Sequence, residues 1–204
     1  MNARQIALAV SAALFLTSCG IGKPTPQPTT YVVEPVMPTQ QIGVQKVPDA
    51  LRMGSVRMAA PFSGNSLVYR LDDVSYVSDP NQAFIADPGS MLGSKMATWL
   101  GHSGAFKSVS QPGINQSAPY VLEATVTELY GDFRQGTPPT AVVAVQFALI
   151  DVLSVRPRIV YERTIEQHEP LDAATPDALV RGYSRAVSQI LIQFVTELSV
   201  QKPI

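Results

Sequence analysis

The second half of the chain contains three long segments in which apolar and polar residues alternate. They are residues 120–130, 140–152 and 158–167. In the middle segment Val143, Val145 and Phe147 fall on one face, and a period of two is typical of a β-strand. Short links containing glycine and proline separate the segments, and such links join antiparallel neighbours. We therefore predict three consecutive strands of one antiparallel sheet.

An amphipathic helix is predicted immediately after these strands, over residues 175–198. Thr175 supplies an N-terminal cap and Pro176 suits the first helical position. The apolar side chains then recur every three or four residues, at Leu179, Tyr183, Val187, Ile190, Phe194 and Leu198. A helix of this kind buries one side, and the sheet before it supplies the surface.

The first half repeats the combination of strands and one helix. Asp87 and Pro88 start a predicted helix over residues 89–100, with its apolar positions at Met91, Leu92, Met96, Trp99 and Leu100. Short β-prone runs surround it at 30–36, 41–47, 55–60, 66–71, 73–79 and 105–109. The predicted fold is α/β (α+β): a two-layer sandwich whose mixed, largely antiparallel sheet carries two amphipathic helices on one face.

The N-terminal segment is typical of a secretory signal. Arg4 provides positive charge, and residues 6–16 are almost entirely apolar. A membrane-spanning helix needs about 20 apolar residues, so this run is too short for a permanent anchor. It ends in Leu-Thr-Ser followed by Cys19, the single cysteine of the chain. This quartet resembles the lipobox of bacterial lipoproteins.

The lipobox resemblance implies cleavage before Cys19, transfer of diacylglycerol to its thiol, and acylation of the new amino terminus with a palmitate-type chain. Two or more acyl chains hold a protein firmly on a membrane. No aspartate follows the cysteine, which by the same resemblance implies the outer membrane, facing the periplasm. We expect a signal peptide at 1–18, the lipidated cysteine and a proline-rich tether at 19–30, and a single α/β domain at 31–204.

Composition narrows the function classes further. The formal net charge is −1, which does not favour nucleic-acid binding. A hydrophobic content of 46% with 15% charged residues indicates a globular domain with a sizeable core. With one cysteine, no internal disulfide framework can form. No cofactor fingerprint is present.

An esterase is the alternative reading of the sequence. The stretch Gly-His-Ser-Gly-Ala around Ser103 resembles a hydrolase nucleophile elbow, and Asp151 and His168 follow in the hydrolase order. The elbow requires a strand before the serine and a helix after it, whereas here the predicted order is reversed. We therefore expect no catalytic residues, and Ser103 is interpreted as part of a helix C-terminal turn.

Other candidate sites have simpler interpretations. His102 and His168 lie too far apart to suggest a metal site. The adjacent Asp72 and Asp73 are either a carboxylate pair or a solvated turn, and the turn is favoured. Met91, Met96 and Trp99 could line a lipid pocket, but their helical spacing favours the core.

Residues 69–109 resemble the ABC-type transport auxiliary lipoprotein family, which includes the paraquat-inducible protein C type. In that family a strand with a tyrosine leads to a loop with an aromatic residue, a helix started by proline, and a strand with the pattern Ala-Phe-x-x-Val. The corresponding positions here are Tyr76, Phe84, Pro88, Ala105, Phe106 and Val109. The aromatic residue before the helix is Phe84, where the family pattern has tryptophan.

The family resemblance implies a non-enzymatic accessory subunit of a transporter that moves phospholipid-like molecules or confers solvent tolerance. The implied partners are an MCE-domain protein and the permease and ATPase of an ABC transporter. Self-association into a ring is a further hypothesis. An envelope assembly lipoprotein unrelated to lipid transport remains the other alternative.

Overall fold

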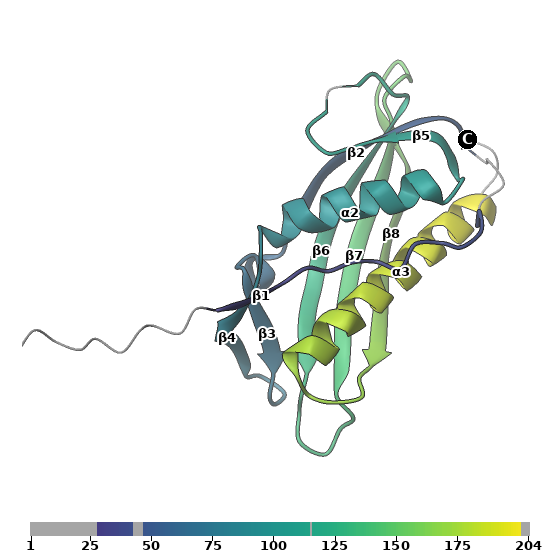
Figure 1. The fold of residues 1–204 in the computed structure, drawn as a ribbon. Helices are drawn as coiled ribbons and strands as arrows, with labels where there is room; N and C mark the ends of the chain where they lie inside the picture. Colours follow the sequence, from purple (N-terminus) through teal and green to yellow (C-terminus); the bar gives the residue numbers. More distant parts are fainter. Residues whose placement is uncertain (1–27, 43–46, 115, 201–204) are drawn as a thin grey trace, which may run out of the picture.

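A computed structural model of the protein describes residues 28–42, 47–114 and 116–200. These residues form one mixed β-sheet with two long helices on one face, which confirms the predicted two-layer architecture (Figure 1). The strands are β1 (Thr29–Tyr31), β2 (Val47–Met58), β3 (Ser66–Arg70), β4 (Tyr76–Phe84), β5 (Phe106–Ser110), β6 (Tyr120–Asp132), β7 (Thr140–Asp151) and β8 (Arg158–Pro170). The helices are α2 (Pro88–His102), α3 (Pro176–Val200) and the short 3-10 helix η1 (Ala60–Phe62).

The three long strands β6, β7 and β8 form the predicted antiparallel meander. Val126 of β6 lies opposite Val145 of β7, which in turn lies opposite Ile165 of β8. All three side chains belong to the buried core. The alternation seen in the sequence therefore identifies the core side correctly at these positions. Ile159 at the start of β8, expected on the same face as Tyr161 and Ile165, is instead 56% exposed next to a register shift.

The other edge of β6 is shared by two strands, which the sequence did not indicate. Its first half pairs with β2 in parallel, and its last two residues pair with the end of β3. β2 also pairs in parallel with β5, so β2, α2 and β5 form a crossover unit within the sheet. Residues 55–58 of the expected short run at 55–60 belong to the twelve-residue strand β2, and Ala60 begins η1. Residues 43–46 of the expected run at 41–47 lie outside the described residues.

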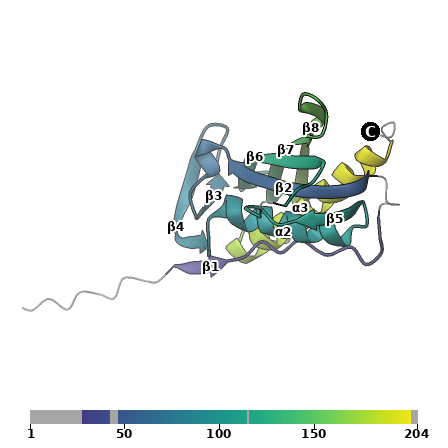
Figure 2. The ribbon, with the colours of Figure 1, turned by 90° about the horizontal axis from the view of Figure 1, so that it is seen from above.

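Both helices begin where the capping signals predict. The Asp87 carboxylate accepts a hydrogen bond from the Ser90 amide at 2.8 Å, and the Thr175 hydroxyl accepts one from the Ala178 amide at 3.3 Å. α2 packs over β2 and β5, while α3 packs over β7 and β8 (Figure 2). Neither helix, nor any other in the described residues, has the length and apolar character needed to cross a bilayer.

The expected strand at 30–36 is shorter in the structure than predicted. Only β1 pairs with the sheet, in parallel with the outer strand β4. Pro35 and Pro38 follow, and proline has no amide hydrogen to donate to a strand partner. The chain instead leaves the sheet, and residues 32–42 run along the outer side of the two helices (Figure 1). We call residues 32–42 the strap.

Candidate functional site

The strap is fastened to α3 by two serines one helical turn apart. The amide of Glu34 donates to the Ser184 hydroxyl at 3.0 Å, and the amide of Val36 donates to the Ser188 hydroxyl at 2.8 Å. Each hydroxyl donates in turn to the carbonyl four residues earlier in its own helix. Each serine hydroxyl therefore accepts one hydrogen bond from the strap and donates another within the helix.

The spacing of these bonds matches the two kinds of backbone. Four helical residues rise about 6 Å, and two extended residues span about 6.6 Å. Alternate amides of an extended strap can therefore meet serines placed at i and i+4 on a helix without distortion. Val33 and Pro35, which alternate with the two bonded residues along the strap, are buried.

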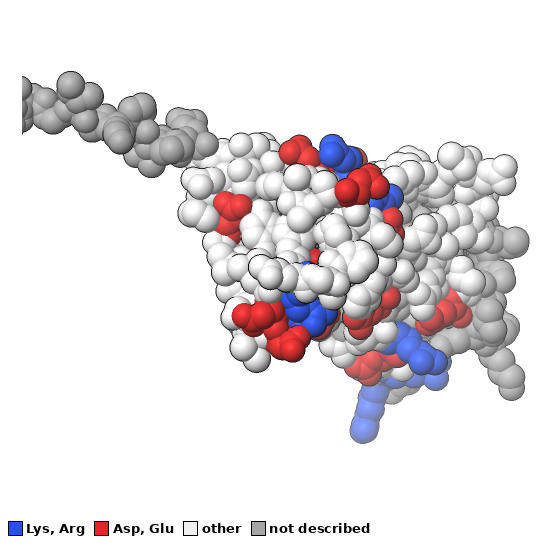
Figure 3. All heavy atoms as spheres, turned by 90° about the horizontal axis from the view of Figure 1, so that it is seen from below, with Lys and Arg blue, Asp and Glu red and all other residues white. Residues whose placement is uncertain are grey.

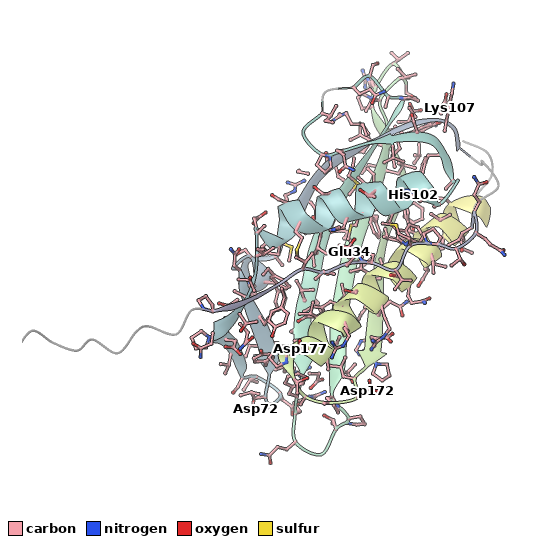
Figure 4. The ribbon with its side chains drawn as sticks, viewed as in Figure 1. Glu34, Asp72, His102, Lys107, Asp172 and Asp177 are labelled. Carbon is pink, nitrogen blue, oxygen red and sulfur yellow. The ribbon has the colours of Figure 1, made fainter. Side chains whose placement is uncertain are left out.

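The other helix holds the strap from its opposite side. The indole nitrogen of Trp99 in α2 donates to the carbonyl of Val36 at 2.8 Å, and Lys95 forms an ion pair with Glu34. Glu34 lies where the strap passes over the two helices (Figure 4). Farther along, the amide of Ile42 donates to the carbonyl of Ser103 at 3.0 Å. The strap thus joins α2 to α3, which make few direct contacts with each other.

A shallow groove of about 470 Å³ runs between the strap and α3. It is lined by Val32, Glu34, Val36, Val180, Arg181, Ser184 and Arg185. Its walls combine valine side chains with one acidic and two basic groups. Arg185 is paired with Glu169 of β8, so its charge is partly neutralised within the protein.

A second hollow of about 420 Å³ lies at the end of the molecule, between the β3–β4 turn and the β6–β7 loop. Arg134 bridges Asp132 and Asp73 there, with 2.8 Å ion-pair distances to both. The hydrogen bond from Arg134 is the main reason that the pKa of Asp132 is below its usual value. Figure 3 views the molecule from this end, where acidic and basic side chains alternate and no single charge dominates.

The two adjacent aspartates form the favoured solvated turn. One carboxylate oxygen of Asp72 accepts from the amides of Val74 and Ser75, at 2.8 and 2.7 Å. Hydrogen bonds from Ser75 and Val74 lower the pKa of Asp72. Asp73 instead faces Arg134, so the two carboxylates have separate structural roles.

The residues of the hypothetical esterase triad have separate structural partners. Ser103 is fully buried, and its hydroxyl donates to the carbonyl of Leu100 at 2.7 Å, which closes the last turn of α2. Asp151 is bonded to the loop that follows it, and His168 is paired with Glu166 on β8. No described hydrogen bond or ion pair joins any two members of the triad. The helix-turn interpretation of Ser103 is therefore confirmed.

The methionines, the tryptophan and the histidine of α2 have structural roles. Met96 and Trp99 are fully buried and Met91 nearly so, which confirms the core interpretation. His102 bonds to the carbonyl of Thr98 within α2. Over the ranges that the structure describes, no three histidine, cysteine or acidic side chains gather as metal ligands do. Cys19 lies outside the described residues.

Sequence reasoning missed the strap and its anchor points. Ser184 and Ser188 are separated by four residues on α3, but serines at this spacing occur on many exposed helix faces. The residues that they bind lie 150 and 152 positions away in the chain. No local pattern identifies such a pairing.

The described residues thus form a mixed sheet with one helical layer, which an extended N-terminal segment crosses. Residues 31–194 match the family of ABC-type transport auxiliary lipoprotein components. The chain belongs to this family, which confirms the resemblance found in the sequence. The family implies an accessory role in transport at the cell envelope, in association with an ABC-type transporter.

Solved structures share the fold at low sequence identity. The crystal structure of protein XCC0632 from Xanthomonas campestris has a TM-score of 0.67 and 18% identity, and the similarity covers 85% of this chain and 93% of that one. A hypothetical protein from Chlamydia trachomatis has a TM-score of 0.52 and 10% identity, covering 76% of this chain and 100% of its own. At such identities the similarity concerns the fold alone. No curated protein matches the chain at a significant level.

Proposed function

We propose that this protein is a lipid-anchored, non-catalytic subunit of an MCE-type lipid transport system. Cys19 carries the acyl chains, the proline-rich segment at 19–30 spans the gap from the outer membrane, and the α/β domain docks partner subunits in the periplasm. The family supports the accessory role in ABC-type transport. The lipobox supports the anchor. The MCE-domain partner is inferred from the family resemblance.

The observation that carries the proposal is the continuity between the tether and the strap. The chain passes from the tether through β1 directly into residues 32–42, which are bonded to α2 and α3. A pull on the N-terminus is thus borne by the helix layer and not by a single peripheral contact. This arrangement suits a domain whose function depends on being held in position.

The test is co-purification from envelopes. The full-length protein with a C-terminal affinity tag is solubilised in mild detergent after brief cross-linking, and bound proteins are identified by mass spectrometry. We expect an MCE-domain protein together with the permease and ATPase of an ABC transporter. A tagged outer-membrane lipoprotein of unrelated fold serves as the control.

Two outcomes would contradict the proposal. Recovery of envelope assembly proteins without any transporter subunit would favour the envelope assembly alternative. Recovery of no protein beyond the control set would remove the docking role. Light scattering on the same detergent-solubilised sample tests the separate hypothesis that copies of the chain associate.

A further inference from the structure

The loop between β7 and β8 carries a group of exposed aliphatic side chains. We call residues 152–159, which comprise this loop and the first two residues of β8, the tip. Within it Leu153 is 73% exposed, Val155 fully exposed and Ile159 56% exposed. Ile114, in the loop between β5 and β6 at the same end of the sheet, is 54% exposed. The tip therefore places several aliphatic groups in water, which costs free energy unless they are covered.

The tip is held in a defined shape. The carboxylate of Asp151 accepts hydrogen bonds from the amide of Leu153 at 3.0 Å, from the amide of Ser154 at 3.2 Å and from the Ser154 hydroxyl at 2.6 Å. The hydrogen bond from Ser154 is the largest cause of the lowered pKa of Asp151. The amide of Val152 donates to the carbonyl of Pro119. These hydrogen bonds fix the backbone at residues 152–154, beside the exposed side chains of Leu153 and Val155.

The charges of the tip are basic. Arg156 forms no ion pair with the part of the chain that the structure describes, whereas Arg158, with its side chain 64% exposed, is paired with Asp151 at 3.5 Å. The β3–β4 turn at the other end of the sheet provides a contrast. There Val74 is 87% exposed, but its neighbours are Asp72 and Asp73. Asp73 is paired there with Arg70 and Arg134, whereas Arg156 at the tip has no ion-pair partner among the described residues.

We propose that the tip is a second membrane contact, which inserts Leu153 and Val155 into the surface of an anionic phospholipid bilayer. Arg156 and Arg158 then meet lipid phosphates, as basic residues beside apolar ones do at membrane surfaces. A bilayer suits the tip better than a protein partner does. The tip is a strand-to-strand connection of eight residues without an aromatic side chain, and a stable protein interface needs about 800 Å² on each partner.

The inference rests on the proposed anchor at Cys19, because a tethered tip needs little affinity of its own. Holding the domain beside the bilayer raises the effective concentration of lipid around the tip. A ten-residue proline-rich tether reaches about 30 Å. β1 lies toward the C-terminal end of β6, whereas the tip extends beyond its N-terminal end (Figure 1). Contact at both places turns the domain onto its side along the membrane.

The experiment uses the full-length lipoprotein reconstituted into vesicles of phosphatidylethanolamine and phosphatidylglycerol. Val155→Cys introduces a thiol that is labelled with the environment-sensitive dye nitrobenzoxadiazole, because the thiol of Cys19 is blocked by lipid. Val74→Cys, labelled in the same way, is the matched control at the opposite end of the sheet. Quenching is measured with nitroxide lipids from within the bilayer and with iodide from the water phase.

We expect nitroxide lipids to quench the Val155→Cys probe several-fold more than the Val74→Cys probe, with the reverse order for iodide. The difference should shrink in vesicles that lack phosphatidylglycerol, and after Arg156→Glu. Equal quenching of both probes would overturn the inference. So would a Val155→Cys probe shielded from iodide but untouched by nitroxide lipids, which would indicate a protein contact, including a second copy of this chain.

Flotation of the same vesicles separates this inference from the proposed anchor. If the protein does not float with the vesicles, it lacks the lipid attachment, and the proposed anchor at Cys19 is refuted. The tip is then tested separately by adding the protein to an excess of vesicles. A protein that floats with an unquenched tip retains the anchor and refutes the second contact.

Discussion

Tyr183 combines a well-packed aromatic ring with a buried hydroxyl that lacks a hydrogen-bond partner among the described residues. Its side chain is fully buried against Phe84, with ring centroids 6.3 Å apart. Burial raises the pKa of Tyr183 well above its usual value. The buried hydroxyl therefore costs stability that the ring offsets.

We predict that Tyr183→Phe leaves the protein as stable as wild type or raises its stability by up to about 1 kcal/mol, because an unsatisfied buried hydroxyl is removed. Tyr161→Phe is the matched control. The hydroxyl of Tyr161 donates to Glu197 at 2.7 Å, so its removal should cost about 1 kcal/mol. Urea denaturation measures both. Equal losses in the two variants would show that the hydroxyl of Tyr183 has a partner.

Asp87 is the residue that starts α2, and its effect depends on pH. Hydrogen bonds from Ser90 lower the pKa of the Asp87 carboxyl below its usual value. A carboxyl whose pKa is lower in the folded state stabilises the fold above the unfolded pKa of about 4. That contribution is lost as the pH falls through the lower, folded-state pKa.

We predict that Asp87→Ala lowers the free energy of unfolding by about 1 kcal/mol at neutral pH, whereas Asp87→Ser retains most of the cap. The difference between wild type and Asp87→Ala should narrow as the pH is taken below 4, because the wild-type carboxyl then becomes protonated. Denaturation curves at several pH values test this. A constant difference across the series would contradict the role of the charge.

At the scale of elements, the position of the helices depends on a close approach of α3 to β7 and on the strap that binds both helices. Gly182 of α3 faces β7 where a side chain does not fit. A Cβ there would lie 2.8 Å from the Cβ of Ala141 and 2.4 Å from a methyl carbon of Leu171. The glycine thus sets how closely α3 approaches the sheet.

We predict that Gly182→Ala destabilises the protein by about 1–3 kcal/mol, because overpacking outweighs the gain in helix propensity. Gly64→Ala is the control, since a Cβ at that position meets no atom within 4 Å. Thermal denaturation of both variants tests the prediction. An unchanged melting temperature for Gly182→Ala would mean that α3 can shift away from β7 at little cost.

We predict that the double variant Ser184→Ala, Ser188→Ala loosens the strap while the sheet remains intact. The amides of Glu34 and Val36 lose their acceptors, at about 1 kcal/mol each. Hydrogen exchange at these two amides should become faster, with unchanged protection in β7. Gln189→Ala on the exposed side of the same helix is the control. Unchanged exchange in the double variant would refute the role of the serines.

At the scale of the whole molecule, the relevant property is the position of the domain relative to the membrane. The chain forms the edge strand β1, crosses both helices as the strap and returns to the sheet at β2 (Figure 1). The proposed anchor at Cys19 precedes this path in the chain, whereas the buried core is made of residues from Val33 onward. Attachment and folding should therefore be separable.

We predict that Cys19→Ala abolishes lipid attachment while the domain keeps its fold. The variant should migrate as an uncleaved precursor or appear in the soluble periplasmic fraction, and its protease-resistant core should match that of the wild type. Labelling with radioactive palmitate and fractionation of envelopes measure the change. Normal processing and membrane retention of the variant would contradict the lipobox assignment.

The sequence by itself determined the elements whose signals are local. The alternation in β7, the helical spacing in α3 and the cap at Asp87 each depend on residues a few positions apart, so chain order alone reveals them. The turn at Asp72 and the helix-end role of Ser103 followed in the same way. The lipobox around Cys19 is also a local signal, and it stays a prediction.

Only the tertiary structure decided which distant segments meet. The parallel pairing of β2 with β6, the shared edge of β6 and the unpartnered hydroxyl of Tyr183 depend on how the layers pack. The strap is the clearest case, because Glu34 finds its acceptor at Ser184, 150 residues away. Loop closure over such a distance is driven by burial of the whole core, and no short pattern encodes it.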